Sequence, residues 1–214
     1  MLSKNLQSGR KAESLVEVII AIFVVAIGSS VATSLIVTAL QSNSFSRDNL
    51  VALNLAEEGL EAMRSTRDTN WLKYSFDKTN CWNLLPNKTV CTPPVSASDT
   101  IGGNGTQYYV AELDANYVWQ LSAESTALDL NNSNLPNSLF KLQVVQRDGT
   151  FFSPNLLKQY AEIKSDAQDG KFYRMLQISN VSGDSMDVRS IVQWLEGGRV
   201  HQVALDSRLT NYQK

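Results

Sequence analysis

Histidine and cysteine are almost absent from this chain of 214 residues, which contains one histidine, His201, and two cysteines. Catalysis by a Ser-His-Asp arrangement would have to use His201, which lies in a predicted strand near Val200 and Val203. A histidine in such a place is far more often structural than catalytic. We therefore predict no catalytic residue and no cofactor, and we expect that the protein is not an enzyme.

Two kinds of binding site lack their usual residues. The glycine-rich residues 102–105 are not followed by the Lys-Ser or Lys-Thr pair of a phosphate loop, so we interpret them as a turn. Asp166 and Asp169, with a turn at Gly170, could hold calcium through oxygen ligands, but their spacing is not that of a helix-loop-helix calcium site. We interpret them as a solvated acidic turn and predict no metal site.

Charge is absent from residues 18–40, a run of 23 residues. A helix of this length crosses a hydrocarbon layer of roughly 30 Å at about 1.5 Å per residue. The rival interpretation is a secretory signal peptide, but its apolar region is normally only about 7 to 15 residues long and ends at a cleavage site with small residues. We therefore predict a membrane-spanning helix that the mature protein keeps.

The residues before this run form a basic leader. Residues 1–12 contain Lys4, Arg10 and Lys11 and no acid, which predicts that the leader stays in the cytoplasm and that residues 41–214 lie outside. Without these three, 16 of the 19 basic residues remain against 21 acidic ones, a net charge of −5. An acidic chain argues against a nucleic-acid surface, because nonspecific binding comes mainly from neutralising phosphates.

Glu17 does not fit a plain membrane anchor. It lies at the start of the apolar run, between Val16 and Val18. An ionised carboxylate there costs on the order of 2 to 3 kcal/mol to insert, so it needs a partner, and the apolar run contains no basic residue. The alternative is that Glu17 lies solvated at the level of the lipid headgroups and has no role.

The start of the apolar run resembles the cleavage motif of the type IV pilin and type II secretion pseudopilin superfamily. In that family a basic leader and a small residue precede a motif like F-[ST]-L-[IV]-E and a long apolar helix. The matching residues are Ala12, Glu13, Ser14, Leu15, Val16 and Glu17. Ala12 stands where the family usually has glycine, and Glu13 where it usually has an aromatic or apolar residue.

The resemblance implies a processing and assembly route. A prepilin peptidase would cut between Ala12 and Glu13 and methylate the new amino terminus at Glu13. Glu17 could then pair with the terminal amine of a neighbouring subunit, which offsets the desolvation of both charges. The implied partners are the peptidase, other pilin or pseudopilin subunits, an inner-membrane assembly platform and, before assembly, the lipid bilayer.

The helical pattern continues beyond the membrane segment. Leu53, Ala56, Leu60 and Met63 recur at spacings of three and four residues, which predicts one helix over residues 13–69. Residues 13–40 would be its membrane or filament-core half, and residues 41–69 would pack under a head. Residues 54–71 also resemble the segment that ends the long helix in minor prepilins and pseudopilins.

Turn-forming residues dominate residues 70–107, which we predict to be a long loop. Both cysteines, Cys81 and Cys91, lie in it. An even number of cysteines outside the cytoplasm indicates a disulfide. The alternative is a metal site, which would need two more ligands.

The remainder, residues 108–214, alternates like strands. We predict strands at residues 108–113, 117–121, 139–146, 159–164, 172–180, 185–195 and 199–208, with hairpin turns at 148–149 and 196–199. An antiparallel sheet packed on the outer half of the helix gives an α+β fold. Residues 172–178 and 190–211 are also similar to the carboxyl-terminal sheet of minor pilins and pseudopilins.

We therefore expect a structural subunit, a minor pilin or pseudopilin precursor, in the bacterial inner membrane and then in a pilus-like filament or pseudopilus. One alternative is a membrane-anchored extracellular binding protein that does not polymerise, in which Glu17 has no use. The other is a DNA-uptake pilin, which a cluster of basic residues on the head would favour. Arg174, Arg189, Arg199 and Arg208 are dispersed in the sequence but could converge in space.

Overall fold

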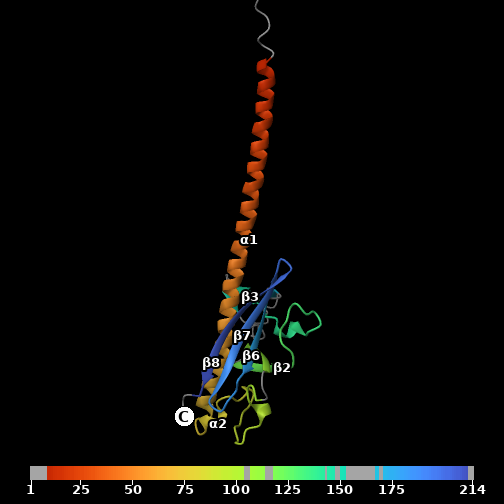
Figure 1. Cartoon of the computed structure of the whole chain (residues 1–214). Helices are drawn as coiled ribbons and strands as arrows, with labels where there is room; N and C mark the ends of the chain where they lie inside the picture. The colour runs from red at the N-terminus through yellow and green to blue at the C-terminus, as the bar shows by residue number, and fades with distance from the viewer. Residues whose placement is uncertain are drawn as a thin grey trace, which may run out of the picture. The chain divides into compact units, whose positions relative to one another are not determined.

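One helix, α1 (Gly9–Lys73), contributes to both of the compact units into which the chain divides, Met1–Asp48 and Asn49–Lys214 (Figure 1). The computed structural model describes residues 9–103, 107–113, 118–142, 144–147, 150–152, 167–168 and 171–211. The second unit contains all of the described strands and is called the head.

In the first unit α1 is a single helix without lateral cover. Every side chain from Leu15 to Arg47 is exposed. No proline interrupts this stretch, and Gly28 costs only about 1 kcal/mol relative to alanine. The predicted helix over residues 13–69 is confirmed, and α1 extends four residues further at each end.

Within the head α1 is amphipathic. Its buried side chains recur at spacings of three and four residues: Ala52, Ala56, Leu60, Met63, Arg67 and Asn70. Leu53, which we expected on the buried face, is only partly buried, so the apolar face begins at Ala52. Trp71 is 5% exposed and packs in the core, which explains why the helix continues past residue 69.

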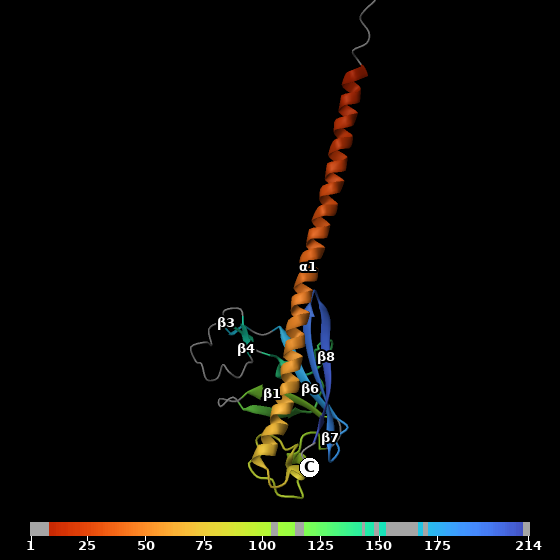
Figure 2. The ribbon, with the colours of Figure 1, turned by 90° about the vertical axis from the view of Figure 1, so that its left-hand side faces the viewer.

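The head contains a five-stranded antiparallel sheet in the order β2-β1-β6-β7-β8 (Figures 1 and 2). Its strands are β1 (Gln107–Leu113), β2 (Trp119–Glu124), β6 (Phe172–Ser179), β7 (Ser185–Glu196) and β8 (Arg199–Thr210). A small sheet in the order β4-β3-β5 comprises β3 (Val144–Arg147), β4 (Thr150–Phe152) and β5 (Ala167–Gln168). Short helical turns are α2 (Lys78–Cys81), η1 (Ala97–Asp99) and η2 (Asn137–Phe140). The long helix and the antiparallel sheet give the predicted α+β fold.

Most predicted strands are confirmed, within a few residues at their ends. The prediction for residues 139–146 is wrong in its first half, where η2 ends at Phe140 and the strand begins only at Val144. The apolar residues at positions 139–142 are typical of a strand, but Phe140 and Leu142 are buried in two different apolar clusters. The strand predicted at 117–121 instead runs from Trp119 to Glu124. The strand predicted at 159–164 lies outside the described residues.

Both predicted pairs of strands are present, and the turn predicted at residues 148–149 lies outside the described residues. Strands β3 and β4 pair up to Arg147 and Thr150, on either side of residues 148–149. Strands β7 and β8 pair over 12 positions, up to Glu196 and Arg199. Between them Gly197 and Gly198 have φ values of 58° and 76°. Two successive positive φ angles are what a type I′ two-residue hairpin turn requires, and glycine adopts them without steric cost.

One face of the large sheet packs on α1. Leu60 and Met63 of the helix lie in one apolar cluster with Leu176, Ile178 and Val188 of the sheet. The helix approaches closely at Gly59. A Cβ atom there would lie 2.4 Å from Ser190 Oγ and 2.9 Å from Leu176 Cδ2.

The other face of the sheet, its outer face, is covered in part by residues 125–142, which we call the strap. The apolar contacts between strap and sheet involve Leu128, Phe140, Val110, Met175 and Ile191. The backbone amide of Leu130 donates to Gln193 Oε1 at 3.1 Å. The sheet is therefore sandwiched between α1 and the strap over part of its area.

Asn211 joins the end of β8 to the end of α1. Its side-chain oxygen accepts a hydrogen bond from Trp71 Nε1 at 3.0 Å, and its side-chain nitrogen donates to the Lys78 carbonyl at 3.2 Å. Its backbone amide donates to the Asp184 carbonyl. Because Asn211 is 3% exposed, these bonds satisfy a polar group that burial would otherwise penalise.

We predict that Gly59→Ala lowers the melting temperature of the head. Alanine favours a helix over glycine by about 1 kcal/mol, so helix propensity alone predicts a gain. The clash with Ser190 and Leu176 predicts a net loss of about 1 to 3 kcal/mol. Thermal unfolding of the full chain in detergent measures the difference. Gly183→Ala is the matched control, since a Cβ atom at Gly183 meets no atom within 4 Å. A Gly59→Ala chain that melts higher than the wild type would contradict the close approach.

Candidate functional site

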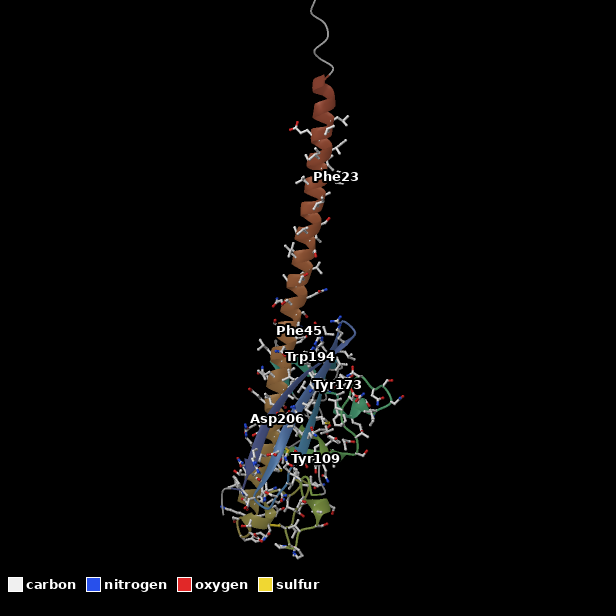
Figure 3. The ribbon with its side chains drawn as sticks, viewed as in Figure 1. Phe23, Phe45, Tyr109, Tyr173, Trp194 and Asp206 are labelled. Carbon is white, nitrogen blue, oxygen red and sulfur yellow. A yellow bond between two sulfur atoms is a disulfide. The ribbon has the colours of Figure 1, made fainter. Side chains whose placement is uncertain are left out.

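The first unit presents apolar side chains on every side of α1. Phe23, Val25 and Leu35 are 65%, 70% and 66% exposed, and the labelled Phe23 in Figure 3 projects away from the helix. A helix that is apolar all round needs cover from lipid or from other helices. This segment is long and apolar enough to cross a membrane, and it is compatible with a single-pass anchor.

Hydroxyl groups in this segment bond to their own helix. Ser30 Oγ donates to the Ala26 carbonyl and Thr33 Oγ1 to the Ser29 carbonyl, each at 2.9 Å. Thr38 Oγ1 does the same to the Ser34 carbonyl. These bonds satisfy polar hydrogens without water, so the hydroxyls add little to the cost of burying the helix in an apolar environment.

Glu17 is the only charged residue between Leu15 and Ser46. Its side chain is exposed on α1, and it forms no ion pair within the described part of the chain. Ala12 and Glu13, which flank the predicted cleavage point, lie within α1, which begins at Gly9. Among the described side chains Glu17 is therefore a lone carboxylate in an apolar surface.

Cys81 and Cys91 form the predicted disulfide, with their Cα atoms 6.0 Å apart. Both are buried, in a cluster with Tyr74 and Leu84. The alternative of a metal site at these cysteines is wrong, because both sulfur atoms are in the bond. Among the described residues no group of three or more His, Cys, Asp or Glu side chains could hold a metal ion. Asp166, Asp169 and Gly170 lie outside the described residues.

The head contains a buried charged side chain, that of Arg174, and our sequence reasoning missed its role. Strand β1 pairs with β6 only at three positions, from Gln107 with Ile178 to Tyr109 with Leu176. Beyond these, β1 continues along β2, and the sheet splits. Arg174 of β6 lies beside this split, and its side chain is 1% exposed.

The Arg174 guanidinium bonds to groups from two other elements. Nη1 donates to the Leu55 carbonyl of α1 at 3.1 Å, and Nη2 donates to the Ala111 carbonyl of β1 at 3.2 Å. Nη1 also lies 3.4 Å from Glu58 Oε2. The guanidinium carbon lies 5.8 Å from the centre of the Trp119 ring, within cation–π range.

Burial lowers the pKa of Arg174 because it penalises the charged form, and the Glu58 carboxylate opposes that shift. Arginine remains protonated at any physiological pH, so the head contains a permanent buried cation. The ion pair with Glu58 and the two carbonyl bonds are therefore necessary for its burial.

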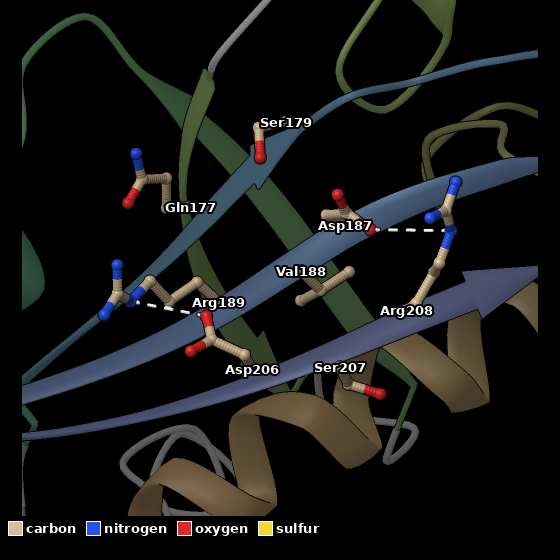
Figure 4. Close-up of a pocket in the computed structure, with 8 residues that line it drawn as sticks. All are labelled: Gln177, Ser179, Asp187, Val188, Arg189, Asp206, Ser207 and Arg208. Atoms are coloured by element: carbon tan, nitrogen blue, oxygen red, sulfur yellow. Dashed lines mark ion pairs between the residues drawn. The ribbon is translucent and has the colours of Figure 1, made fainter.

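The other arginines that we named do not form one basic surface. On the outer face Arg189 Nε lies 3.3 Å from Asp206 Oδ1, and Arg208 Nε lies 3.7 Å from Asp187 Oδ1 (Figure 4). Each of these two cations is thus paired with an acid. Arg199 is at the start of β8, next to the hairpin turn.

A groove of about 420 Å³ lies over these outer-face pairs. Gln177 and Ser179 of β6 also line it (Figure 4). Our sequence reasoning did not single out this groove. The signal that it contained was an Asp-X-Arg pattern in each of two predicted strands, at residues 187–189 and 206–208, which places both charges of a strand on the same face.

His201 lies opposite Trp194 in the β7–β8 pair, and its ring stacks on the Trp194 ring with centroids 5.5 Å apart. The ring therefore takes part in packing between the two strands, as expected for a histidine in a strand.

Comparisons of the chain with models of protein families, with curated proteins and with solved structures found no match.

We predict that Arg174→Met destabilises the head by about 3 to 5 kcal/mol, because it leaves Glu58 and the carbonyls of Leu55 and Ala111 without the guanidinium as their partner. Arg208→Met is the matched control. It breaks an exposed ion pair, which contributes about 1 kcal/mol or less. Denaturant unfolding of the full-length variants measures both losses. Equal losses of unfolding free energy in the two variants would contradict the prediction that Arg174 stabilises the head more than Arg208 does.

We predict that the Cys81→Ser, Cys91→Ser double variant loses about 2 to 3 kcal/mol of stability, the loop-entropy value for a bond spanning 10 residues. Wild-type chain treated with a reductant should melt at the temperature of the variant, and the variant itself should not respond to the reductant. A wild-type chain that melts at the same temperature with and without complete reduction would contradict a stabilising role for the bond.

Proposed function

We propose that this chain is the precursor of a minor pilin or pseudopilin, a structural subunit that assembles through α1 into a pilus-like filament or a type II secretion pseudopilus. The proposal depends on one observation above the others, which is Glu17. It is the only charge in an apolar helical segment of more than 30 residues, and it has no ion-pair partner in the described chain.

The apolar surface of α1 supports assembly through this helix. Its exposed side chains, such as Ile19, Ile27 and Ile36, lie on all sides, so neighbouring helices could cover it completely. Lipid could cover the same surface before assembly, since bilayer chains and packed helices are both apolar environments. The same segment thus serves first as an anchor and then as filament core.

Glu17 gives this assembly a register. After cleavage between Ala12 and Glu13, the new terminal amine is four residues from the carboxylate in the same chain. In a stack of parallel helices, the amine of one subunit reaches Glu17 of the next, and the two charges become a pair instead of two separately desolvated ions. Sliding one helix by a turn, about 5.4 Å, breaks the pair.

The proposed partners are prepilin peptidase, other pilin or pseudopilin subunits and the inner-membrane assembly platform. The subunit would start in the bacterial cytoplasmic membrane with the head outside, where oxidising conditions favour the Cys81–Cys91 bond. The head has no enzymatic role in this proposal.

Direct DNA uptake by the head receives little support. Arg174 is buried, and Arg189 and Arg208 are each paired with an aspartate. A phosphate backbone would have to displace those aspartates, which removes much of the gain from neutralisation.

We predict that protein purified from its native membrane begins at methylated Glu13, and that Glu17→Ala is processed normally but excluded from filaments. Intact mass and amino-terminal sequencing measure the first part, and recovery of the subunit in sheared filaments measures the second. Glu57→Ala is the matched control, because Glu57 is also an exposed glutamate on α1 but lies in the head. It should assemble like the wild type.

The opposite result identifies the alternative. A chain that still begins at Met1, and whose location does not depend on Glu17, is a tethered extracellular binding protein and contradicts the filament proposal. Equal exclusion of Glu17→Ala and Glu57→Ala would show that the assay responds to helix stability and not to the charge in the apolar segment.

A further inference from the structure

The hairpin turn between β7 and β8 lies at the end of the head where α1 enters it (Figures 1 and 2). Near this turn Trp194 of β7 lies in one apolar cluster with Ala52 of α1. At the far end of β8, Leu209 lies in one cluster with Trp71. Asn49, the first residue of the head, therefore lies at the same end as the turn. We call this end the base of the head, and it comprises Leu50, Lys171 and residues 195–199.

Two apolar side chains of the base are exposed, and they lie on opposite sides of it. Leu195 is 48% exposed and points to the outer face of the sheet, like Gln193 two residues earlier. Leu50 is 61% exposed on α1, about 200° around the helix from Ala52, which packs on the sheet. A partner that contacts both leucines must meet the base end-on, and a flat surface does so without a matching groove.

The charges of the base do not balance. Lys171 Nζ lies 3.9 Å from Glu196 Oε1, so these two charges offset each other. Arg47 and Asp48, which precede the base in α1, pair with each other at 3.8 Å. Arg199 is exposed beside the turn and forms no ion pair with any residue that the structure describes. Arg199 is therefore the unbalanced cation of this group.

We propose that the base of the head docks on the surface of the bilayer that α1 crosses. Arg199 contacts lipid phosphates, and Leu50 and Leu195 enter the headgroup layer. The inference rests on the anchoring part of the proposed function and does not depend on filament assembly. Docking holds the head of an anchored, unassembled chain against the membrane.

The covalent connection keeps the base within reach of the bilayer. Leu40 ends the charge-free run, and Asn49 follows nine residues later in the same helix, a rise of about 14 Å. The headgroup layer accounts for about 5 to 8 Å of this rise. The remaining distance is similar to the Debye length, about 8 Å at physiological ionic strength. An anionic lipid surface therefore attracts Arg199.

The residues of the base suit a lipid surface. A phosphate accepts hydrogen bonds from a guanidinium, and exposed leucines gain free energy at the boundary between headgroups and acyl chains. One cation and two leucines bind a membrane only weakly by themselves. Because α1 already confines the head to the membrane surface, its effective concentration there is high and a weak contact is sufficient.

Fluorescence quenching on the full chain tests this contact. Val200→Cys and Thr210→Cys each attach a fluorophore to β8, on the same outer face and about 33 Å apart. Cys81 and Cys91 are bonded to each other and do not react with the fluorophore. Each chain is reconstituted at one copy per nanodisc, with phosphatidylglycerol and a lipid that has a nitroxide on its headgroup. We expect quenching at position 200 and none at position 210.

Arg199→Gln isolates the contribution of the charge. We expect about a fivefold lower ratio of docked to undocked heads, the effect of one cation at an anionic surface, measured by time-resolved emission at position 200. Arg208→Gln is the matched control, because it removes a cation from the other end of the same strand, and it should leave the ratio unchanged. Replacing phosphatidylglycerol with phosphatidylcholine should lower the ratio for the wild type but not further for Arg199→Gln.

Two results would overturn the proposal directly: equal quenching at positions 200 and 210, or quenching at position 200 that Arg199→Gln leaves unchanged. Quenching that appears only when several chains share one membrane identifies a second copy as the partner and also overturns it.

Flotation of the chain with lipid tests the anchor separately. A chain that does not float contradicts the anchor and this inference with it, whereas a chain that floats without quenching contradicts this inference alone. The Glu17→Ala chain should float and dock like the wild type. Loss of filaments with docking retained is the expected result for this variant, so failure of the filament proposal and failure of docking are visible separately.

Discussion

Arg174 extends from β6 beside the split where β1 separates from it, and its two terminal nitrogens bond to carbonyl oxygens of α1 and β1. The packing of the helix on the sheet depends on this contact. Without Arg174, the carbonyl oxygens beside the split would lose a hydrogen-bond partner next to the apolar cluster between helix and sheet. Glu58 supplies the opposite charge from the helix. Gly59, the next residue, has no side chain and therefore lets the helix lie close enough to the sheet for these hydrogen bonds. Two adjacent helix residues, Glu58 and Gly59, thus make the burial of Arg174 possible.

The two units differ in whether their isolated charge, Arg174 or Glu17, has partners within the described chain. The head buries the Arg174 cation and supplies its partners from within, namely two backbone carbonyls for its terminal nitrogens and the Glu58 carboxylate. The first unit presents one carboxylate, Glu17, in an apolar surface that nothing in the described chain covers. A buried or lipid-facing charge without a partner costs several kcal/mol. The head therefore supplies partners for its own buried cation, whereas the described part of the first unit supplies none for Glu17.

Sequence patterns sufficed where the structure depends on local contacts. The long helix follows from residue spacing, β7 and β8 from alternation and a two-glycine turn, and the disulfide from two cysteines in one loop. The split between β1 and β6 was not predictable, because Arg174 contacts a carbonyl 119 residues away at Leu55. The strand predicted at residues 139–146 was wrong in the strap, because apolar residues such as Phe140 and Leu142 are also common in strands. At the candidate site, Glu17 was evident as the lone charge, but the part of the chain that the structure describes does not contain its partner.

The contacts of Asn211 have a consequence for how the protein is made. Asn211 and β8 close the head against the end of α1, and Trp71 is 140 residues earlier in the chain. Synthesis delivers the amino-terminal residues first, so the apolar face of α1 within the head stays uncovered by β8 until the last strand has been made. The head can finish folding only after nearly the whole chain has been synthesised and, in the proposed topology, has crossed the membrane. Until then the apolar face of α1 is not covered by β8, and a pause before the last strand is made leaves Leu60, Met63 and Trp71 exposed to aggregation.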